Sequence, residues 1–172
     1  MKIVEALKNL KTIEKRVEKN CQRINQYAAW VSVETPAFET EERQKQEVQS
    51  LVQANLDLET EYLRLKTAIE STNLAVSVTI NGKTYSISNL VTIKRKVKEF
   101  RTRTYQALQA NSAVTRMQQI YAKGFDAGNP PKVVAAFKEE EKNAKVREWE
   151  DFVSAIDGKL EVVNAETELQ NY

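Results

Sequence analysis

The chain has 172 residues, of which 29% are charged, and it contains only four Gly and three Pro. This balance is typical of long helices with solvated faces and excludes a sandwich of short strands or a disordered tail. The net charge of +2 excludes a polycation, the absence of His excludes the commonest general base and zinc ligand, and the single Cys excludes an intrachain disulfide.

Two long helices are predicted first. Apolar residues recur with alternating steps of three and four, which places each set on one stripe of a helix. The first helix is expected from about Lys2 to Ser32, and the second from Thr40, as its N-cap, to about Asn73. The first stripe contains Ile3, Ala6, Leu10, Ile13, Val17, Asn20, Ile24, Tyr27 and Val31, and the second contains Val48, Leu51, Asn55, Leu58, Tyr62, Leu65, Ile69 and Thr72.

The two stripes match when the chain folds back between Val31 and Val48. Asn20 then faces Asn55, and each is the only strongly polar residue at a seam position of its helix. A pair of amides in a seam costs stability but fixes the register, because a slip would bury both without partners. The sequence therefore predicts a coiled-coil-like antiparallel helical hairpin with these two residues at one level.

The sequence supports two further predictions for residues near this seam. Cys21 follows a seam residue, so a small buried apolar side chain is expected there, with a reactive thiol as the alternative. The connection containing Pro36 is expected to fold Phe38 back onto the helix ends.

A β-hairpin is predicted at residues 76–87, where the apolar spacing changes from helical to alternating. Its centre is Asn81-Gly82, which favours a type I′ turn because both turn residues need positive φ. An isolated hairpin is only marginally stable in water, so its apolar face should pack on the helices or on another subunit. The expected cross-strand pairs are Val76 with Ile87, Val78 with Tyr85, Ser77 with Ser86 and Thr79 with Thr84.

Two further helices are predicted after the hairpin. One starts at Ser88 or Asn89 and is expected to break around Ala110 to Ser112 before the loop Gly124–Pro131, and the other starts near Lys132. The stripe of the first contains Leu90, Ile93, Val97 and Phe100, extended by Ala107, Leu108, Val114 and Tyr121, and the stripe of the second contains Val146, Trp149, Val153, Ile156, Leu160 and Val163.

Six basic residues crowd the stretch 94–103 of the third predicted helix. Such a face could neutralise phosphates with a salt-dependent, sequence-blind affinity. A solvated face or contact with an acidic partner is the simpler interpretation, since aromatic residues for base stacking are sparse: Phe100 is expected in the core, which leaves Tyr105. The six residues are Lys94, Arg95, Lys96, Lys98, Arg101 and Arg103.

No other residue set predicts a catalytic, cofactor-binding or metal site. Side chains at consecutive helix positions diverge, so the run Glu139–Glu141 is expected on a surface helix rather than in a metal cage. Gly124–Gly128 lacks the Lys-Ser or Lys-Thr pair that follows a phosphate loop. Neither Glu59 with Glu61 nor Glu166 with Glu168 is a paired acid by any sequence argument.

Short matching segments are spread along the chain. They are Met1-Lys2-Ile3, Glu5-Ala6-Leu7, Ile13, Lys15-Arg16, Pro36, Ile69, Thr72-Asn73, Asn81-Gly82, Leu90, Leu160, Asn164-Ala165 and Thr167-Glu168-Leu169. In the order of these segments the chain resembles the septicolysin-like family of short bacterial and phage-encoded helical proteins, over about two-thirds of its length. The stretch from Asn111 to Glu150 departs from the family's pattern. The resemblance implies a helical oligomer with a small β element, and it carries over no catalytic residues.

These patterns predict one mostly α domain over residues 1–172, with a long antiparallel helical hairpin, a β-hairpin and two further helices. Self-association is expected, because large apolar residues such as Trp30, Phe38 and Leu56 fall beside the seams. The expected function is that of a non-enzymatic, oligomeric structural or assembly protein, with a phage or phage-like particle as a reasonable home. Its partners would be further copies of the chain or other particle proteins.

The alternative function is that of a cytosolic nucleic-acid-associated protein that uses the basic face 94–103. No cofactor or metal is expected in either case. No apolar run reaches the length of a signal-peptide core or a membrane span, so a cytoplasmic or virion location is expected.

Overall fold

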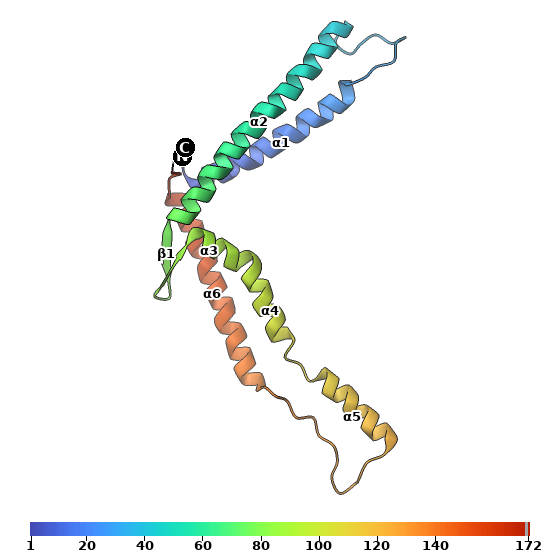
Figure 1. Cartoon of the computed structure of the whole chain (residues 1–172), viewed down its shortest axis with the longest axis vertical. Helices are drawn as coiled ribbons and strands as arrows, with labels where there is room; N and C mark the ends of the chain where they lie inside the picture. Colours follow the sequence, from blue (N-terminus) through green and yellow to red (C-terminus); the bar gives the residue numbers. More distant parts are fainter. Residues whose placement is uncertain (171) are drawn as a thin grey trace. The chain divides into compact units, whose positions relative to one another are not determined.

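The computed structural model describes residues 1–170 and 172, and it is mostly helical (Figure 1). One antiparallel helix pair and one two-stranded β-hairpin are present, as the sequence predicts. The elements in chain order are α1 (Ile3–Tyr27), α2 (Glu41–Ala75), β1 (Ser77–Ile80), β2 (Lys83–Ser86), α3 (Ile87–Thr92), the π-helical segment η1 (Ile93–Val97), α4 (Lys98–Gln106), α5 (Asn111–Lys123) and α6 (Glu139–Glu166).

The chain forms two compact units. Unit 1 consists of Met1–Val78, Ser86–Ser88 and Leu160–Tyr172, and unit 2 consists of Thr79–Tyr85 and Asn89–Lys159. Charge is divided unequally between them. Unit 1 has 11 Lys and Arg against 15 Asp and Glu, a net charge of −4, whereas unit 2 has 15 against nine, a net charge of +6. The single domain expected for residues 1–172 stays a prediction.

In unit 1, α1 and α2 lie side by side and antiparallel (Figure 1). Asn20 Nδ2 donates a hydrogen bond of 2.9 Å to Asn55 Oδ1, which confirms the predicted register of the seam. The buried core of the seam lies on the side of this amide pair toward the start of α1 and the end of α2, and residues of both predicted stripes form it. It contains Ala6, Leu10, Ile13, Leu65 and Ile69, with the partly buried Val17, Leu58, Tyr62 and Leu169 packed against it.

The side-chain amide of one buried glutamine holds together the connection between α1 and α2. Gln44 accepts a hydrogen bond of 2.8 Å from the backbone N–H of Ala37 and donates one of 2.9 Å to the carbonyl of Tyr27. The ring of Phe38 packs edge-on against Tyr27 at 4.9 Å, which confirms that it folds back onto the helix end. α1 therefore ends at Tyr27 and not at Ser32, because Gln44 takes a carbonyl of the last turn.

Replacing Gln44 with leucine should lower the free energy of unfolding by about 1.5 kcal/mol, because the change leaves a donor and an acceptor of the connection unpaired. Urea denaturation followed by circular dichroism measures this loss. Gln46→Leu is the matched control, since Gln46 is an exposed glutamine on the same turn of α2 and should change stability little. Equal losses in both variants would contradict the structural role of Gln44.

The β-hairpin has the predicted turn. Asn81 and Gly82 both have positive φ, 50° and 75°, as a type I′ turn requires. The hydroxyls of Thr79 and Thr84 lie 3.3 Å apart, which confirms their cross-strand pairing. The strands are shorter by one residue at their outer ends than predicted, since α3 begins at Ile87, ahead of the expected caps at Ser88 or Asn89.

The helix after the hairpin contains a π turn that the sequence does not predict. The N–H of Lys98 donates to the carbonyl of Ile93, five residues earlier. A π turn inserts one residue into the helical repeat, so it rotates the following residues relative to the earlier stripe. After the turn, Val97, Tyr105 and Leu108 are half-buried, and the exposed Arg101 lies against the ring of Trp149. Phe100 is therefore 60% exposed, and the prediction that it is buried is wrong.

Two other boundaries differ from the sequence prediction. The expected break lies at residues 107–110, a little before Ala110 to Ser112. The last helix starts at Glu139, and its predicted start near Lys132 is wrong. Val134 in the intervening stretch is 86% exposed, so its side chain gives a helix there no packing contact. The predicted stripe of α6 is confirmed, since Trp149, Val153, Ile156 and Leu160 are buried.

The two ends of the chain meet in unit 1 (Figure 1). The N–H of Ile3 donates to the carbonyl of Thr167 at 3.0 Å, and the N–H of Leu169 donates to the carbonyl of Met1 at 2.8 Å. The hydroxyl of Thr72, which is fully buried, accepts a 2.9 Å hydrogen bond from the N–H of Gln170. These contacts fasten the end of α2 to both ends of the chain.

Candidate functional site

A groove of about 880 Å³ lies in unit 2. The turn of the β-hairpin, the helix formed by η1 and α4, and the middle of α6 form its walls. Its lining residues are Ile80, Asn81, Lys83, Tyr85, Ile93, Val97, Phe100, Arg101, Thr104, Tyr105, Lys145, Glu148, Trp149 and Phe152. Five of these are aromatic and three are basic, so the groove combines flat apolar surfaces with positive charge.

Three aromatic rings of the groove lie next to one another, with their planes tilted. The rings of Trp149 and Phe152 lie 5.5 Å apart, and those of Phe152 and Tyr85 lie 6.0 Å apart. The guanidinium of Arg101 lies 3.9 Å from the centre of the Trp149 ring, a cation–π contact. Trp149 is buried, and within the described chain its indole N–H has no hydrogen-bond partner.

A lysine and a glutamate neutralise each other at the rim. Lys145 Nζ donates a hydrogen bond of 2.8 Å to a carboxylate oxygen of Glu148. This bond and the charge of Glu148 raise the pKa of Lys145, while the same contact lowers the pKa of Glu148. Both groups therefore remain charged around neutral pH, and Glu148 adds no net negative charge to the groove.

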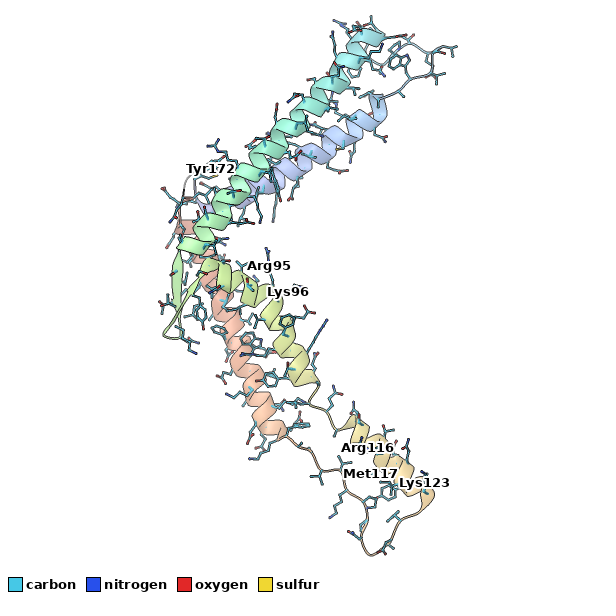
Figure 2. The ribbon with its side chains drawn as sticks, in the orientation of Figure 1. Arg95, Lys96, Arg116, Met117, Lys123 and Tyr172 are labelled. Carbon is cyan, nitrogen blue, oxygen red and sulfur yellow. The ribbon has the colours of Figure 1, made fainter. Side chains whose placement is uncertain are left out.

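The predicted basic face 94–103 falls into two sets. Three of its residues have partners: Lys94 pairs with Asp157 at 2.6 Å, Arg103 pairs with Glu99 at 2.6 Å, and Arg101 stacks on Trp149. The others have no acidic partner in the part of the chain that the structure describes, and they are exposed: Arg95, Lys96 and Lys98. Figure 2 shows Arg95 and Lys96 on the π turn.

Sequence reasoning found this basic face but missed the groove beside it. Tyr105 was the one residue expected to be available for stacking, and it does line the groove. The sequence pattern predicts Phe100 in the core because the π turn leaves no periodic mark in the sequence. The other walls come from segments more than sixty residues apart, such as Lys83 and Glu148, and no local pattern joins them.

A second surface lies on the side of α2 away from its seam. Four apolar residues are exposed there, and steps of four, seven and eleven residues separate them: Val52, Leu56, Leu63 and Leu74. Each of these steps returns to nearly the same side of a helix, so the four residues form one line, which we call the outer stripe. Leu56 is exposed, as expected for a large apolar residue outside the seam, although it lies away from the seam and not beside it, whereas Trp30 and Phe38 are half-buried.

The remaining candidates do not assemble into a site. The burial expected for Cys21 is wrong: it is exposed, and its Sγ accepts a 3.5 Å hydrogen bond from Asn55, because a two-helix seam covers only a narrow stripe. In the acidic run, Glu139 pairs with Lys142 and Glu141 pairs with Lys138. Among the described residues, no group of three or more Cys, Asp and Glu side chains is placed to hold a metal ion.

Local contacts hold the loop Gly124–Pro131. Asp126 Oδ1 accepts a 2.9 Å hydrogen bond from the N–H of Gly128, and Phe125 packs edge-on against Tyr121 at 4.5 Å. Figure 2 shows Arg116, Met117 and Lys123 on the neighbouring helix α5. Glu59, Glu61, Glu166 and Glu168 are exposed.

None of the described helices is both long enough and apolar enough to cross a membrane. Comparison with protein-family models, with curated proteins and with solved structures found no match.

Proposed function

We propose that this protein is a non-enzymatic structural or assembly subunit that associates with further copies of itself through the outer stripe of α2. The observation that carries this proposal is the exposure of Leu56 and Leu63, which are 51% and 58% exposed on one side of a helix whose other side is already packed. A helix with two apolar stripes is typical of a bundle in which it has two neighbours. α1 is the first neighbour, and a second copy of the chain supplies the other.

The outer stripe is complementary to itself about Leu63. Val52 and Leu74 each lie eleven residues from Leu63, so an antiparallel contact centred there places Val52 against Leu74 of the second copy. The same arrangement brings Glu59 within one helical position of Lys66 of the second copy. Lys66 also pairs with Glu70 of its own helix at 3.4 Å, so in the contact it lies between two carboxylates, Glu70 and Glu59 of the second copy.

One border of the outer stripe is uncharged. Covering it requires no desolvation of an ion, so the loss of water there costs little. The residues of this border are Gln49, Gln53, Thr60, Thr67 and Ser71. A contact from Val52 to Leu74 would extend about 33 Å along the helix, which is long enough for several layers of packed side chains.

A phage or phage-like particle is the setting that the septicolysin-like resemblance supports. The absence of His from the sequence supports a non-enzymatic role, since it removes the commonest general base. Location of the encoding gene among virion genes, together with recovery of the chain from purified particles, would support this setting. Its absence from such particles would restrict the proposal to self-assembly alone.

Light scattering of the purified chain tests the self-association. At micromolar concentration in 0.5 M salt, the measured mass should exceed the 19.7 kDa of one chain. Leu63→Glu should raise the dissociation constant at least tenfold, because it places a carboxylate in the apolar contact beside Glu59. Circular dichroism should be unchanged, since Leu63 is exposed within one chain.

Leu7→Glu is the matched control. Leu7 is an exposed leucine on α1, away from the outer stripe, so this variant should keep the mass of the unaltered protein. A wild-type chain that stays monomeric, or an assembly that survives Leu63→Glu, would overturn the proposal.

A further inference from the structure

We propose that the groove of unit 2 binds single-stranded nucleic acid, with bases stacked on its aromatic and guanidinium surfaces and phosphates along the unpaired basic residues beside it. This inference is independent of the assembly proposed for the outer stripe of α2. It rests on three observations in unit 2: exposed flat side chains, a groove that they line together with Lys83 and Arg101, and further basic residues without acidic partners on the helix that forms one wall of the groove.

The first observation concerns the flat side chains that are exposed in the groove. Phe100 lines the groove and is 60% exposed, so its ring is open to contact with a ligand. Arg101 is held flat against Trp149 on one side and is exposed to solvent, so it presents a planar cation to a base. Tyr105 lies one helical turn beyond Arg101 and lines the same groove.

The π turn explains how these groups come together. Without it, the spacing of the apolar residues would bury Phe100 and turn Arg101 toward solvent. The inserted residue exchanges their positions, so that the arginine lies over Trp149 and the phenylalanine lies at the groove. π turns of this kind occur frequently at functional sites.

The positive charge is available for phosphates. Lys83 lines the groove and has no acidic partner in the described part of unit 2. Three more basic residues without such a partner lie on the helix that forms one wall, outside the groove lining: Arg95, Lys96 and Lys98. The one acid in the groove, Glu148, is neutralised by Lys145. The whole unit carries a net charge of +6, which attracts a polyanion from a distance.

A single strand fits this arrangement better than a duplex or an acidic peptide. Flat side chains can stack only on bases whose faces are open, and a duplex hides those faces. An acidic peptide would satisfy the lysines but would leave Phe100 and Tyr105 without a stacking partner. Surfaces of this kind hold about two or three bases, and stacking makes them tolerant of sequence.

Fluorescence anisotropy of a labelled oligothymidylate of 12 nucleotides, titrated with the full-length chain, tests the inference. The affinity should fall about 50-fold between 50 and 200 mM salt if four phosphates are contacted. Phe100→Ala and Tyr105→Ala should each weaken binding about tenfold at constant salt and leave the salt dependence unchanged. Lys96→Ala should instead reduce the slope of the salt dependence by about 0.7.

Trp149 supplies a second readout. The chain has two tryptophans, and Trp30 lies in unit 1, so Trp30→Phe leaves Trp149 as the only indole. The fluorescence of that variant should change on addition of the oligonucleotide, with the same midpoint as the anisotropy. The matched controls are Phe125→Ala, an exposed aromatic residue of unit 2 outside the groove, and Arg16→Ala, an exposed basic residue of unit 1. Neither should alter binding.

Three results would overturn the proposal. Absence of binding at 50 mM salt is the first. Equal affinity for a duplex together with no effect of Phe100→Ala would mean that charge alone retains the nucleic acid. Binding of polyglutamate in place of the oligonucleotide would assign the groove to an acidic protein partner.

Discussion

Replacing Leu65 with alanine is expected to lower the free energy of unfolding by about 3 kcal/mol. Leu65 is completely buried in the core of unit 1, where it packs in one cluster with Leu10 and Ile69 from both sides of the seam. The change removes apolar area from the core and leaves a cavity, because two long helices cannot close onto the gap independently of their neighbours. Urea denaturation followed by circular dichroism measures the loss.

Leu63→Ala is the matched control for this change. Leu63 lies two residues from Leu65 on the same helix, but it is exposed in the isolated chain. At concentrations low enough to prevent association, its replacement should alter the free energy of unfolding by less than about 0.5 kcal/mol. At high concentration it should weaken self-association. Equal losses for the two variants in the dilute chain would contradict the assignment of the seam.

Replacing Gly82 with valine is expected to destabilise the β-hairpin by about 2 kcal/mol. Gly82 has a φ of 75°, a conformation that a β-branched residue strongly disfavours. No atom would lie within 4 Å of an added Cβ, so the loss would come from the backbone conformation and not from a clash. Thermal unfolding of the variant provides the measurement.

Two substitutions separate this cause from a general effect of replacing glycine. Gly82→Asn should cost much less than Gly82→Val, because asparagine tolerates the left-handed region. Gly158→Ala in α6 should instead increase stability by up to about 1 kcal/mol, since that position is helical and has open space for a methyl group. A hairpin that tolerated valine at position 82 would show that the type I′ turn is assigned wrongly.

The elements that the sequence predicts well are those with a local or repeating signal. The alternation of three and four residues marks the seam, and the amide pair then sets its register, which the hydrogen bond between Asn20 and Asn55 confirms. The Asn81-Gly82 pair marks the hairpin because few other dipeptides accept positive φ at both positions. In each case the chemistry that determines the structure lies within a few residues of the feature itself.

The features that the sequence does not predict depend either on a contact with a distant residue or on a local irregularity that the pattern of apolar residues does not record. The end of α1 is determined by the side chain of Gln44, seventeen residues away from Tyr27. The exposure of Phe100 depends on one inserted residue at the π turn, which the pattern of apolar residues does not record. The basic face 94–103 could be found because its charges are contiguous, but the groove beside it could not, since α6 supplies Trp149 only after folding.

The hydrogen bonds between the two ends of the chain determine when unit 1 can be completed during synthesis. α1 and α2 can pair as soon as they emerge, because their contacts are close in sequence. Thr167 and Gln170 arrive only after some ninety further residues, which takes roughly 5–18 s at ordinary rates of translation. Throughout that interval the outer stripe of α2 is already displayed while Thr72 still lacks its partner. Under the self-association that we propose, neighbouring chains translated from one messenger RNA would meet through α2 during synthesis, so that assembly would begin on the polysome.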